Sequence, residues 1–332
     1  MTSSFAQHRN LDGLYQTIQE EIRLVEESLR DIGRSSNPLI AEVNAYLAEQ
    51  GGKRIRPALL ILCSKLAGYA GHDHIFWSAL IEVIHTASLV HDDIIDNAAF
   101  RRGQDTVHAR WGPNITVLLG DFLYIQSIAL ALKRKNYQII DIIAEATSQM
   151  IEGELLEFYM SGQTDIAEDR YLDILDKKTA SLFSASCEIG GLLGKTSPGG
   201  GEKLREFGRN LGLSFQIIDD LLDYIGDPST LGKPVLSDLQ EGRITLPLIY
   251  SLARASDADR SELVRIIQQR PVEKASIENV LAIVRGNGAL DYAFRKAAAY
   301  SEQAKSLLAA FPPSDFRAAL ALAADFVLQR KK

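Results

Sequence analysis

Apolar residues recur with helical spacing along almost the whole chain. Between residues 11 and 32 they fall three or four positions apart with charges between them, which predicts an amphipathic helix that ends near Gly33. Pro38 opens a second helix through Leu47, because proline is favoured in the first helical turn. The same periodicity predicts helices at residues 75–97, 113–133, 136–161, 168–194, 201–225, 243–255, 258–270, 275–287, 290–309 and 314–330.

The pattern offers little support for other kinds of secondary structure. Strict alternation of apolar and polar residues is nearly absent, so strands are not expected. No Pro/Ser-rich linker divides the chain, and no internal repeat suggests a solenoid. We therefore predict one all-α domain over residues 1–332, a bundle of ten or more helices around a central cavity.

Composition narrows the class of protein. The 332 residues are 46% hydrophobic and 24% charged, which is ordinary for a soluble globular protein, and the net charge of −7 argues against nucleic-acid binding. Residues 1–10 are polar and do not form a signal peptide, and the apolar run 115–132 is interrupted by Asp121 and Gln126. Cys63 and Cys187 lack metal-site spacing and indicate a reducing compartment. We expect a cytoplasmic protein without a membrane span.

The first chemical signal is an acidic helix end. After an apolar segment the chain reads His91-Asp92-Asp93-Ile94-Ile95-Asp96. Asp92 and Asp96 are one helical turn apart, so their like charges repel by roughly 0.2–0.5 kcal/mol even in water. A divalent cation such as Mg²⁺ would compensate them, whereas the alternative is a solvated acidic patch.

A second motif repeats this spacing. Asp219-Asp220-Leu221-Leu222-Asp223 follows Gln216 late in another apolar helix. Two such motifs facing each other would hold divalent cations across a cavity, and such a cluster needs an anionic ligand such as a phosphate.

Basic residues supply a matching charge. They form one group before the first motif and another group near the two motifs, which indicates two diphosphate sites, one bound through metal and one bound directly. The residues concerned are Lys53, Arg56, Arg101, Arg102, Lys177, Lys178, Lys233 and Arg243.

These motifs together resemble the trans-prenyltransferases, the head-to-tail polyprenyl diphosphate synthases. The resemblance rests on Gly-Gly-Lys-Arg-x-Arg-Pro, His85, two DDxxD motifs, Arg-Arg-Gly, Lys-Thr and Gly-Lys-Pro, in order from about Gly51 to Pro247. Arg243 stands where the family often has lysine, which keeps the charge but changes its shape. The resemblance implies the isoprenoid synthase type I fold, a homodimer with residues 115–132 as a plausible interface, and three Mg²⁺ per active site.

The resemblance also implies roles for individual residues. Asp93 and Asp220 are expected beside the metal ligands, pairing with arginines. The implied metal-site residues are Asp92, Asp96 and Asp219, with Asp223 at a metal-bound water. The implied ligands of isopentenyl diphosphate are Lys53, Arg56, His85 and Arg102. The implied ligands of the allylic diphosphate are Arg101, Lys178 and Lys233. The implied catalytic group is Lys178, Thr179 and Gln216.

Two small residues bear on product length. Ser88 is four residues before Asp92, one turn or about 5.4 Å deeper along the helix, and Ala87 is its neighbour. A bulky aromatic in this region closes the cavity in related short-chain enzymes, so we expect a product longer than C20. Alternatively, these small residues only allow close helix packing.

Three other functions remain open. A short-chain farnesyl or geranylgeranyl diphosphate synthase would share every motif. A class I terpene cyclase shares the metal-triggered ionisation but needs no second diphosphate site. A non-catalytic regulatory subunit would be expected to lose aspartates, and both motifs are intact.

Overall fold

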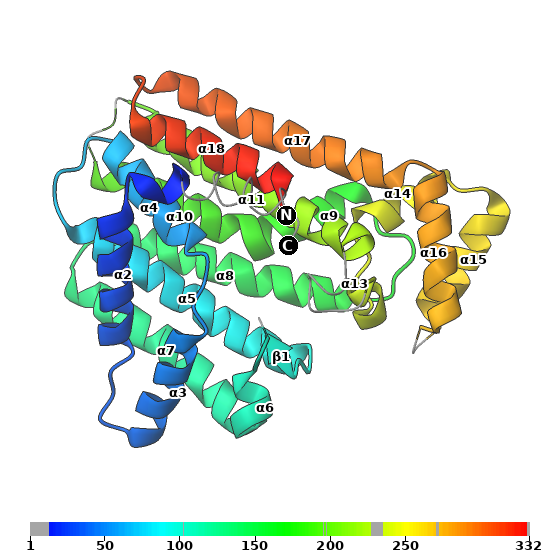
Figure 1. The fold of residues 1–332 in the computed structure, drawn as a ribbon, viewed down its shortest axis with the longest axis horizontal. Helices are drawn as coiled ribbons and strands as arrows, with labels where there is room; N and C mark the ends of the chain where they lie inside the picture. The colour runs from blue at the N-terminus through cyan, green and yellow to red at the C-terminus, as the bar shows by residue number, and fades with distance from the viewer. Residues whose placement is uncertain are drawn as a thin grey trace, which may run out of the picture. The chain divides into compact units, whose positions relative to one another are not determined.

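The computed structural model describes residues 13–101, 103–194, 196, 198–226, 235–269 and 272–330. Among these residues nearly all regular structure is helical, as predicted (Figure 1). The chain divides into two compact units. Unit 1 comprises residues 1–147, 182–208 and 308–322, and unit 2 comprises residues 148–181, 209–307 and 323–332. Each unit is made of three separate stretches of the chain, so the division does not follow a single boundary in the sequence. A single domain over residues 1–332 therefore stays a prediction.

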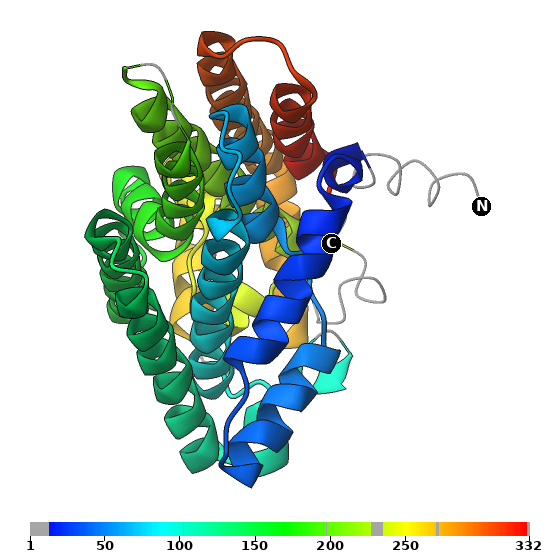
Figure 2. The ribbon, with the colours of Figure 1, turned by 90° about the vertical axis from the view of Figure 1, so that its left-hand side faces the viewer.

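Unit 1 is built around α4 (Ile55–Leu66) and α5 (Asp73–Ile95). α4 is buried along most of its length, and α5 packs against α4, α2 (Gln19–Ile32) and α7 (Pro113–Lys133). Figure 2 shows α2 running beside α5. The unit also holds α3 (Pro38–Glu49), α6 (Val107–Trp111), the 3₁₀ turn η2 (Leu308–Ala310) and parts of α8 (Tyr137–Met160), α10 (Ser181–Leu193), α11 (Gly200–Ile225) and α18 (Asp315–Gln329).

Unit 2 contains the remaining parts of α8, α11 and α18, together with helices from the C-terminal half of the chain. α14 (Leu246–Arg254) packs against α17 (Ala289–Leu307), α15 (Asp257–Gln268) and α16 (Lys274–Gly286) (Figure 1). The remaining elements are α9 (Glu168–Leu175), the π-helical turn η1 (Asp176–Ala180) and α13 (Ser237–Glu241).

Three features depart from the sequence-based expectation. Two short strands, β1 (Phe100–Arg101) and β2 (Gln104–Asp105), form a hairpin where no strand was expected, and Gly103 in its turn has a φ of 78°. The helix predicted from residue 243 begins at Leu246, with Pro247 in its first turn. The segment predicted as one helix over 168–194 contains the π turn η1.

α7 bears on the expectation that the chain has no membrane span. The interruption by Asp121 and Gln126 led us to expect no helix able to cross a membrane. Among the described residues, α7 alone is long and apolar enough to do so by length and composition. This is weak support for a membrane span, because core helices of soluble proteins meet the same criterion.

Candidate active site

The C-terminal turn of α5 carries Asp92 and Asp96 on the same side of the helix. The amide N–H of Asp96 donates to the carbonyl of Asp92 at 2.8 Å, and Asp96 is the C-cap of α5. Both side chains are partly buried. Carboxylates at the negative end of a helix dipole are unfavourable unless a cation lies nearby. This turn therefore favours a bound cation.

Asp93, on the buried side of the same turn, pairs with an arginine. Its Oδ1 accepts from Nε of Arg101 at 2.7 Å, and the hairpin after α5 carries that arginine. Burial raises the pKa of Asp93, and the charge of Arg101 opposes this effect. The arginine expected beside Asp93 is therefore present.

His91 ties this end of α5 to α7. Its Nε2 lies 3.2 Å from the Val117 carbonyl oxygen and 3.5 Å from Oδ1 of Asp121. A Cβ on Gly120 would come within 2.2 Å of Nε2, so only glycine lets the two helices approach here. Sequence reasoning gave His91 no role of its own. Gly120, a glycine inside an apolar helix, was the one local hint that another element packs closely there.

A second charged site in unit 1 is the segment Lys53–Arg56, which leads into the first turn of α4 and is called the basic turn below. Arg54 is the N-cap of α4, with a left-handed backbone at φ 49°, and its side chain does not cap the helix. The Arg56 guanidinium lies over the Phe183 ring at 4.6 Å, and its buried Nε has no partner among the described residues. Burial lowers the pKa of Arg56 to about 10, while the Glu82 carboxylate acts in the opposite direction. The helix N-terminus and this unpaired donor together favour an anion.

His85 lies on α5, three residues after Glu82. Glu82 precedes it by one helical turn, and Nη1 of Arg54 donates to the Glu82 carboxylate at 2.9 Å. The face of α5 that carries His85 is thereby tied to the basic turn. Three of the four predicted isopentenyl diphosphate ligands, Lys53, Arg56 and His85, belong to unit 1; the fourth, Arg102, lies outside the described residues.

Asp219, on α11 in unit 2, pairs with the C-terminal segment. Its Oδ1 accepts from Nη2 of Arg330 at 2.7 Å, and the Arg330 guanidinium lies 3.9 Å from the centre of the Phe215 ring. The Asp219 side chain is still 45% exposed, whereas that of Arg330 is only 6% exposed. An arginine thus occupies one oxygen of a predicted metal ligand. No local sequence pattern indicated this long-range pair.

A hydrogen-bonded chain links the catalytic candidates of unit 2. Thr179 donates to Oε1 of Gln216 at 2.9 Å, and the Gln216 amide donates to Asp220 at 2.8 Å. The Tyr171 hydroxyl donates to the other oxygen of Asp220 at 2.6 Å. Asp220 was expected to pair with an arginine, but these contacts come from tyrosine and glutamine. Burial raises its pKa to about 8, with Asp238 adding to the effect.

Asp223 is enclosed by a different set of donors. The N–H and hydroxyl groups of Ser237 donate to its Oδ1 at 3.2 and 2.7 Å, and the N–H of Asp238 donates to Oδ2 at 3.1 Å. The residue is 1% exposed. Asp223 therefore caps α13 in this structure, and its role at a metal-bound water stays a prediction.

Lys178 projects from the π turn toward α8. Its Nζ lies 2.5 Å from Glu154 and 2.6 Å from Glu157. A Cβ on Gly153 would come within 2.5 Å of the Lys178 backbone nitrogen, so this glycine lets the two backbones pack closely. Lys177, the neighbouring residue, pairs instead with Glu152 and Asp173. The π turn thus directs two consecutive lysines to different partners.

The last two predicted basic residues are Arg243, which the structure describes, and Lys233, which it does not. Arg243 pairs with Asp238 at 2.9 Å and with Glu241, just before α14 rather than within it. Lys233 lies outside the described residues.

The predicted chain-length residues differ in burial. Ala87 is completely buried, whereas Ser88 is partly buried and its Oγ donates to the carbonyl of His85 at 2.8 Å. The two positions therefore do not offer equal room for a larger side chain.

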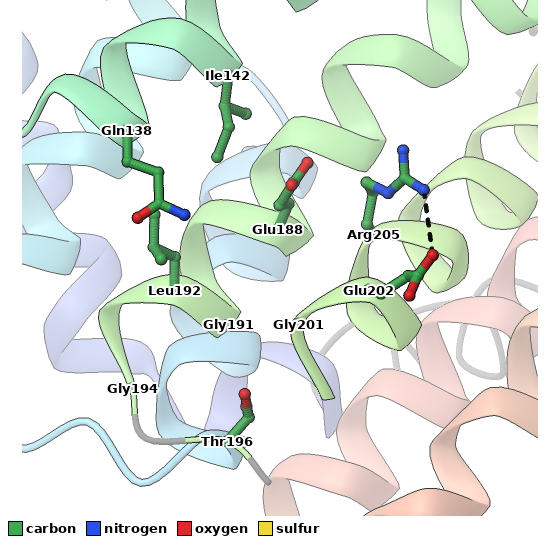
Figure 3. A pocket seen from close by; sticks show the side chains of 10 residues that line it. All are labelled: Gln138, Ile142, Glu188, Gly191, Leu192, Gly194, Thr196, Gly201, Glu202 and Arg205. Atoms are coloured by element: carbon green, nitrogen blue, oxygen red, sulfur yellow. Dashed lines mark ion pairs between the residues drawn. The ribbon is translucent and has the colours of Figure 1, made fainter. Parts of the chain in front are cut away.

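A cavity of about 480 Å³ lies in unit 1 between parts of α8, α10 and α11 (Figure 3). Gln138, Glu188 and Arg205 line it, and Arg205 pairs there with Glu202. Burial raises the pKa of Glu188. None of the described residues that line this cavity is a predicted site residue.

The predicted metal ligands suit magnesium in type. Asp92 and Asp96 in unit 1, and Asp219 in unit 2, each offer carboxylate oxygens, the hard ligands that Mg²⁺ takes together with water and phosphate. Among the described residues, no group of three or more acidic, histidine or cysteine side chains is arranged to hold a metal ion by itself. The missing ligands would come from water and from a phosphorylated substrate.

A sequence model described as polyprenyl synthetase matches residues 37–284, a span that includes the basic turn and both aspartate motifs. The chain belongs to this family. It is therefore a prenyltransferase, and the predicted all-α polyprenyl synthase fold is confirmed.

Individual polyprenyl synthetases match over nearly their full length. The chain is 33% identical over 323 residues to the octaprenyl diphosphate synthase of Escherichia coli (strain K12), covering 97% of this chain and 100% of that protein. It is 35% identical over 311 residues to the short chain isoprenyl diphosphate synthase of Methanothermobacter thermautotrophicus, covering 92% and 94%. A polyprenyl synthase of Caulobacter crescentus, complexed with calcium and isoprenyl diphosphate, has a TM-score of 0.92 at 35% identity, covering 97% and 98%.

Proposed function

We propose that the chain is a Mg²⁺-dependent polyprenyl diphosphate synthase that adds isopentenyl diphosphate to an allylic diphosphate. The observation that carries the proposal is the presence of two differently built charged sites. Asp92 and Asp96 offer oxygen ligands for a metal, whereas Lys53 and Arg56 offer cations to an anion directly. A substrate pair with one metal-bound and one directly bound diphosphate accounts for both sites.

The metal would be held by Asp92, Asp96 and Asp219, with Asp223 at a metal-bound water and three Mg²⁺ in all. When bound, Mg²⁺ stabilises the negative charge that develops on the leaving pyrophosphate. Asp219 would have to release Arg330, because the same oxygen cannot serve the guanidinium and the metal equally well.

The allylic diphosphate would be held by Arg101, Lys178 and Lys233. Arg101 uses Nε for Asp93, and the other nitrogens of its fork can face a phosphate. The carboxylates of Glu154 and Glu157 hold the Lys178 ammonium at a defined place. These cations stabilise the charge of the departing group.

Isopentenyl diphosphate would be held by Lys53, Arg56, His85 and Arg102. The Nε of Arg56, which pairs with no described residue, and the α4 N-terminus support this assignment, because both offer donors to an anion.

The reaction then proceeds in three steps. The allylic C–O bond breaks and leaves a carbocation, the double bond of isopentenyl diphosphate attacks that cation, and the proton lost goes to the departing pyrophosphate. Thr179 and Gln216, which are hydrogen-bonded to each other, present oxygen dipoles near the cation. Water must be excluded, since it would quench the carbocation.

The product is all-trans and longer than C20. Small side chains at Ala87 and Ser88 support a deep channel, and the similarity to an octaprenyl diphosphate synthase agrees with it. A short-chain synthase is the alternative, since a short-chain relative matches at similar identity.

The enzyme would act in the cytoplasm as a homodimer. Leu118, Ile125 and Leu132 recur one heptad apart on α7 and are 68%, 66% and 50% exposed. A regularly spaced apolar face of this kind suits the same helix of a second copy.

The test is incubation with Mg²⁺, isopentenyl diphosphate and farnesyl diphosphate, followed by length analysis of the lipid. We expect products beyond C20 that disappear when the metal is chelated. Products that stop at C20 would favour the short-chain alternative. An inert protein that activates a second synthase would favour a regulatory subunit.

A further inference from the structure

Arg54 has an unusual backbone for its residue type. It lies between Lys53 and Arg56 in the turn before α4, and its φ of 49° falls in the left-handed region that favours glycine. A strained backbone of this kind persists only where surrounding contacts hold it, and such strain is common at functional sites.

The contacts that hold Arg54 come from its own side chain. Nε donates to Oε1 of Glu26 at 2.6 Å, and Nη2 lies 3.3 Å from Oε2 of the same carboxylate. Nη1 donates to Glu82 at 2.9 Å. The side chains of Arg54 and Glu82 are only 10% and 7% exposed. The turn is thereby anchored to α2 and to α5.

This geometry separates Arg54 from the cations on either side. All three nitrogens of its guanidinium already contact the carboxylates of Glu26 and Glu82, so this side chain is engaged within unit 1. Arg56 instead lies over Phe183, and its Nε has no hydrogen-bond partner in the part of the chain that the structure describes. The carbonyl of Lys53 accepts from the Tyr15 hydroxyl.

We propose that Arg54 is a positioning residue, whose ion pairs with Glu26 and Glu82 hold the turn so that Lys53 and Arg56 meet the isopentenyl diphosphate. This proposal rests on the proposed function, which makes those two residues diphosphate ligands. Because Glu82 stands one turn before His85 on α5, the same clamp also fixes the turn relative to the third ligand.

Calorimetric titration of the full chain with isopentenyl diphosphate tests the proposal without requiring turnover. Arg54→Met removes both ion pairs but keeps an extended side chain, and we expect it to raise Kd at least tenfold at unchanged stoichiometry. An unchanged stoichiometry shows that the protein is folded, so weaker binding then reports a misplaced turn. Arg23→Met, which removes exposed ion pairs of α2, is the matched control and should leave Kd unchanged.

Two further variants keep the proposal falsifiable. Arg54→Gly permits the left-handed backbone but lacks the clamp, so it should also raise Kd; normal binding by this variant would overturn the proposal. Glu26→Gln keeps the ion pair between Arg54 and Glu82 and should weaken binding about threefold. This milder variant tests the clamp even if Arg54→Met does not fold. Unchanged binding by a folded Glu26→Gln would then count against the clamp.

Lys53→Ala and Arg56→Ala separate this proposal from the function on which it rests. If they weaken binding while Arg54→Met binds within twofold of the wild type, the positioning role is wrong and the proposed function stands. If neither Lys53→Ala nor Arg56→Ala weakens binding, isopentenyl diphosphate does not bind at the basic turn. That result would overturn both the positioning role of Arg54 and the proposed two-site function.

Discussion

The guanidinium of Arg330 lies 2.7 Å from the Asp219 carboxylate, although the two residues are 111 positions apart in the chain. An arginine fixed on this carboxylate competes with any metal ion that needs the same oxygen. The structure thus holds one predicted metal ligand in an ion pair.

Removing Arg330 should therefore strengthen metal binding in the absence of substrate. We expect Arg330→Met to bind Mn²⁺ about tenfold more tightly, since the lost contact is a hydrogen bond between charged groups. Electron paramagnetic resonance titration with Mn²⁺ measures this affinity. Arg317→Met, which removes an arginine that contacts a backbone carbonyl, is the control. Unchanged or weaker binding in Arg330→Met would contradict the competition.

Gly153→Ala should impair catalysis through the π turn. The new Cβ would collide with the Lys178 backbone, so η1 must shift and displace Lys178 and Thr179. A displacement of about 1 Å can lower turnover about 100-fold. Steady-state kinetics on the folded variant measures the loss. Gly201→Ala is the control, because a Cβ there would meet no described atom within 4 Å. Normal turnover by a folded Gly153→Ala would show that the turn tolerates movement.

Ser88→Phe should shorten the product. The side chain of Ser88 is partly buried beneath Asp92, so an aromatic ring there can close a channel without disrupting the core. Chromatography of the dephosphorylated lipids gives the chain length. Ala87→Phe is a poorer test, because Ala87 is completely buried and overpacking costs about 1–3 kcal/mol. An unchanged product distribution in Ser88→Phe would eliminate the channel wall proposed here.

His74 should make stability depend on pH. Burial lowers its pKa from 6.5 to about 4, and neither ring nitrogen has a partner among the described residues. The neutral ring is favoured in the folded state, so its contribution is complete above pH 6.5 and is lost as the pH falls toward 4. The loss should reach up to about 3 kcal/mol.

Urea unfolding between pH 7.5 and 4 measures that effect. His74→Phe should flatten the pH dependence of the free energy of unfolding, because it removes the buried ring whose pKa is lowered. Equal slopes for the wild type and His74→Phe would assign the dependence to other groups.

A charge on α7 should disrupt the proposed homodimer. Ile125 is 66% exposed, so Ile125→Lys costs little in an isolated chain but places a charge within an apolar interface. We expect sedimentation to report a dimer for the wild type and a monomer for the variant. Asp141→Lys, at an exposed polar position of α8, serves as a control for the added charge. A variant that remains dimeric would place the interface elsewhere.

Sequence pattern predicted the helices well because their signals are local. Apolar spacing and glycine or proline stops located α5, α7 and α11 within a few residues of their observed ends. The π turn was missed because apolar spacing predicts one continuous helix there, and the close packing of Gly153 on Lys178 comes from another helix. The β1–β2 hairpin was missed because its strands contain only two residues each.

The candidate site was predictable in residue type but not in pairing. The two DDxxD motifs and the basic turn are visible as short motifs. The partners of Asp219 and Asp220, which are Arg330 and Tyr171, come from distant parts of the chain, and no local pattern links them. The same holds for Arg54, since Glu26 and Glu82 both lie 28 positions away.

The most direct measurement of the central claim is the amount of pyrophosphate released per isopentenyl unit incorporated. Labelled isopentenyl diphosphate and farnesyl diphosphate are supplied together with Mg²⁺, and a parallel reaction omits isopentenyl diphosphate. We predict one pyrophosphate per unit incorporated, chains longer than C20, and almost no release without isopentenyl diphosphate. Release of pyrophosphate from farnesyl diphosphate alone, without elongation, would contradict the two-site account and indicate a terpene cyclase.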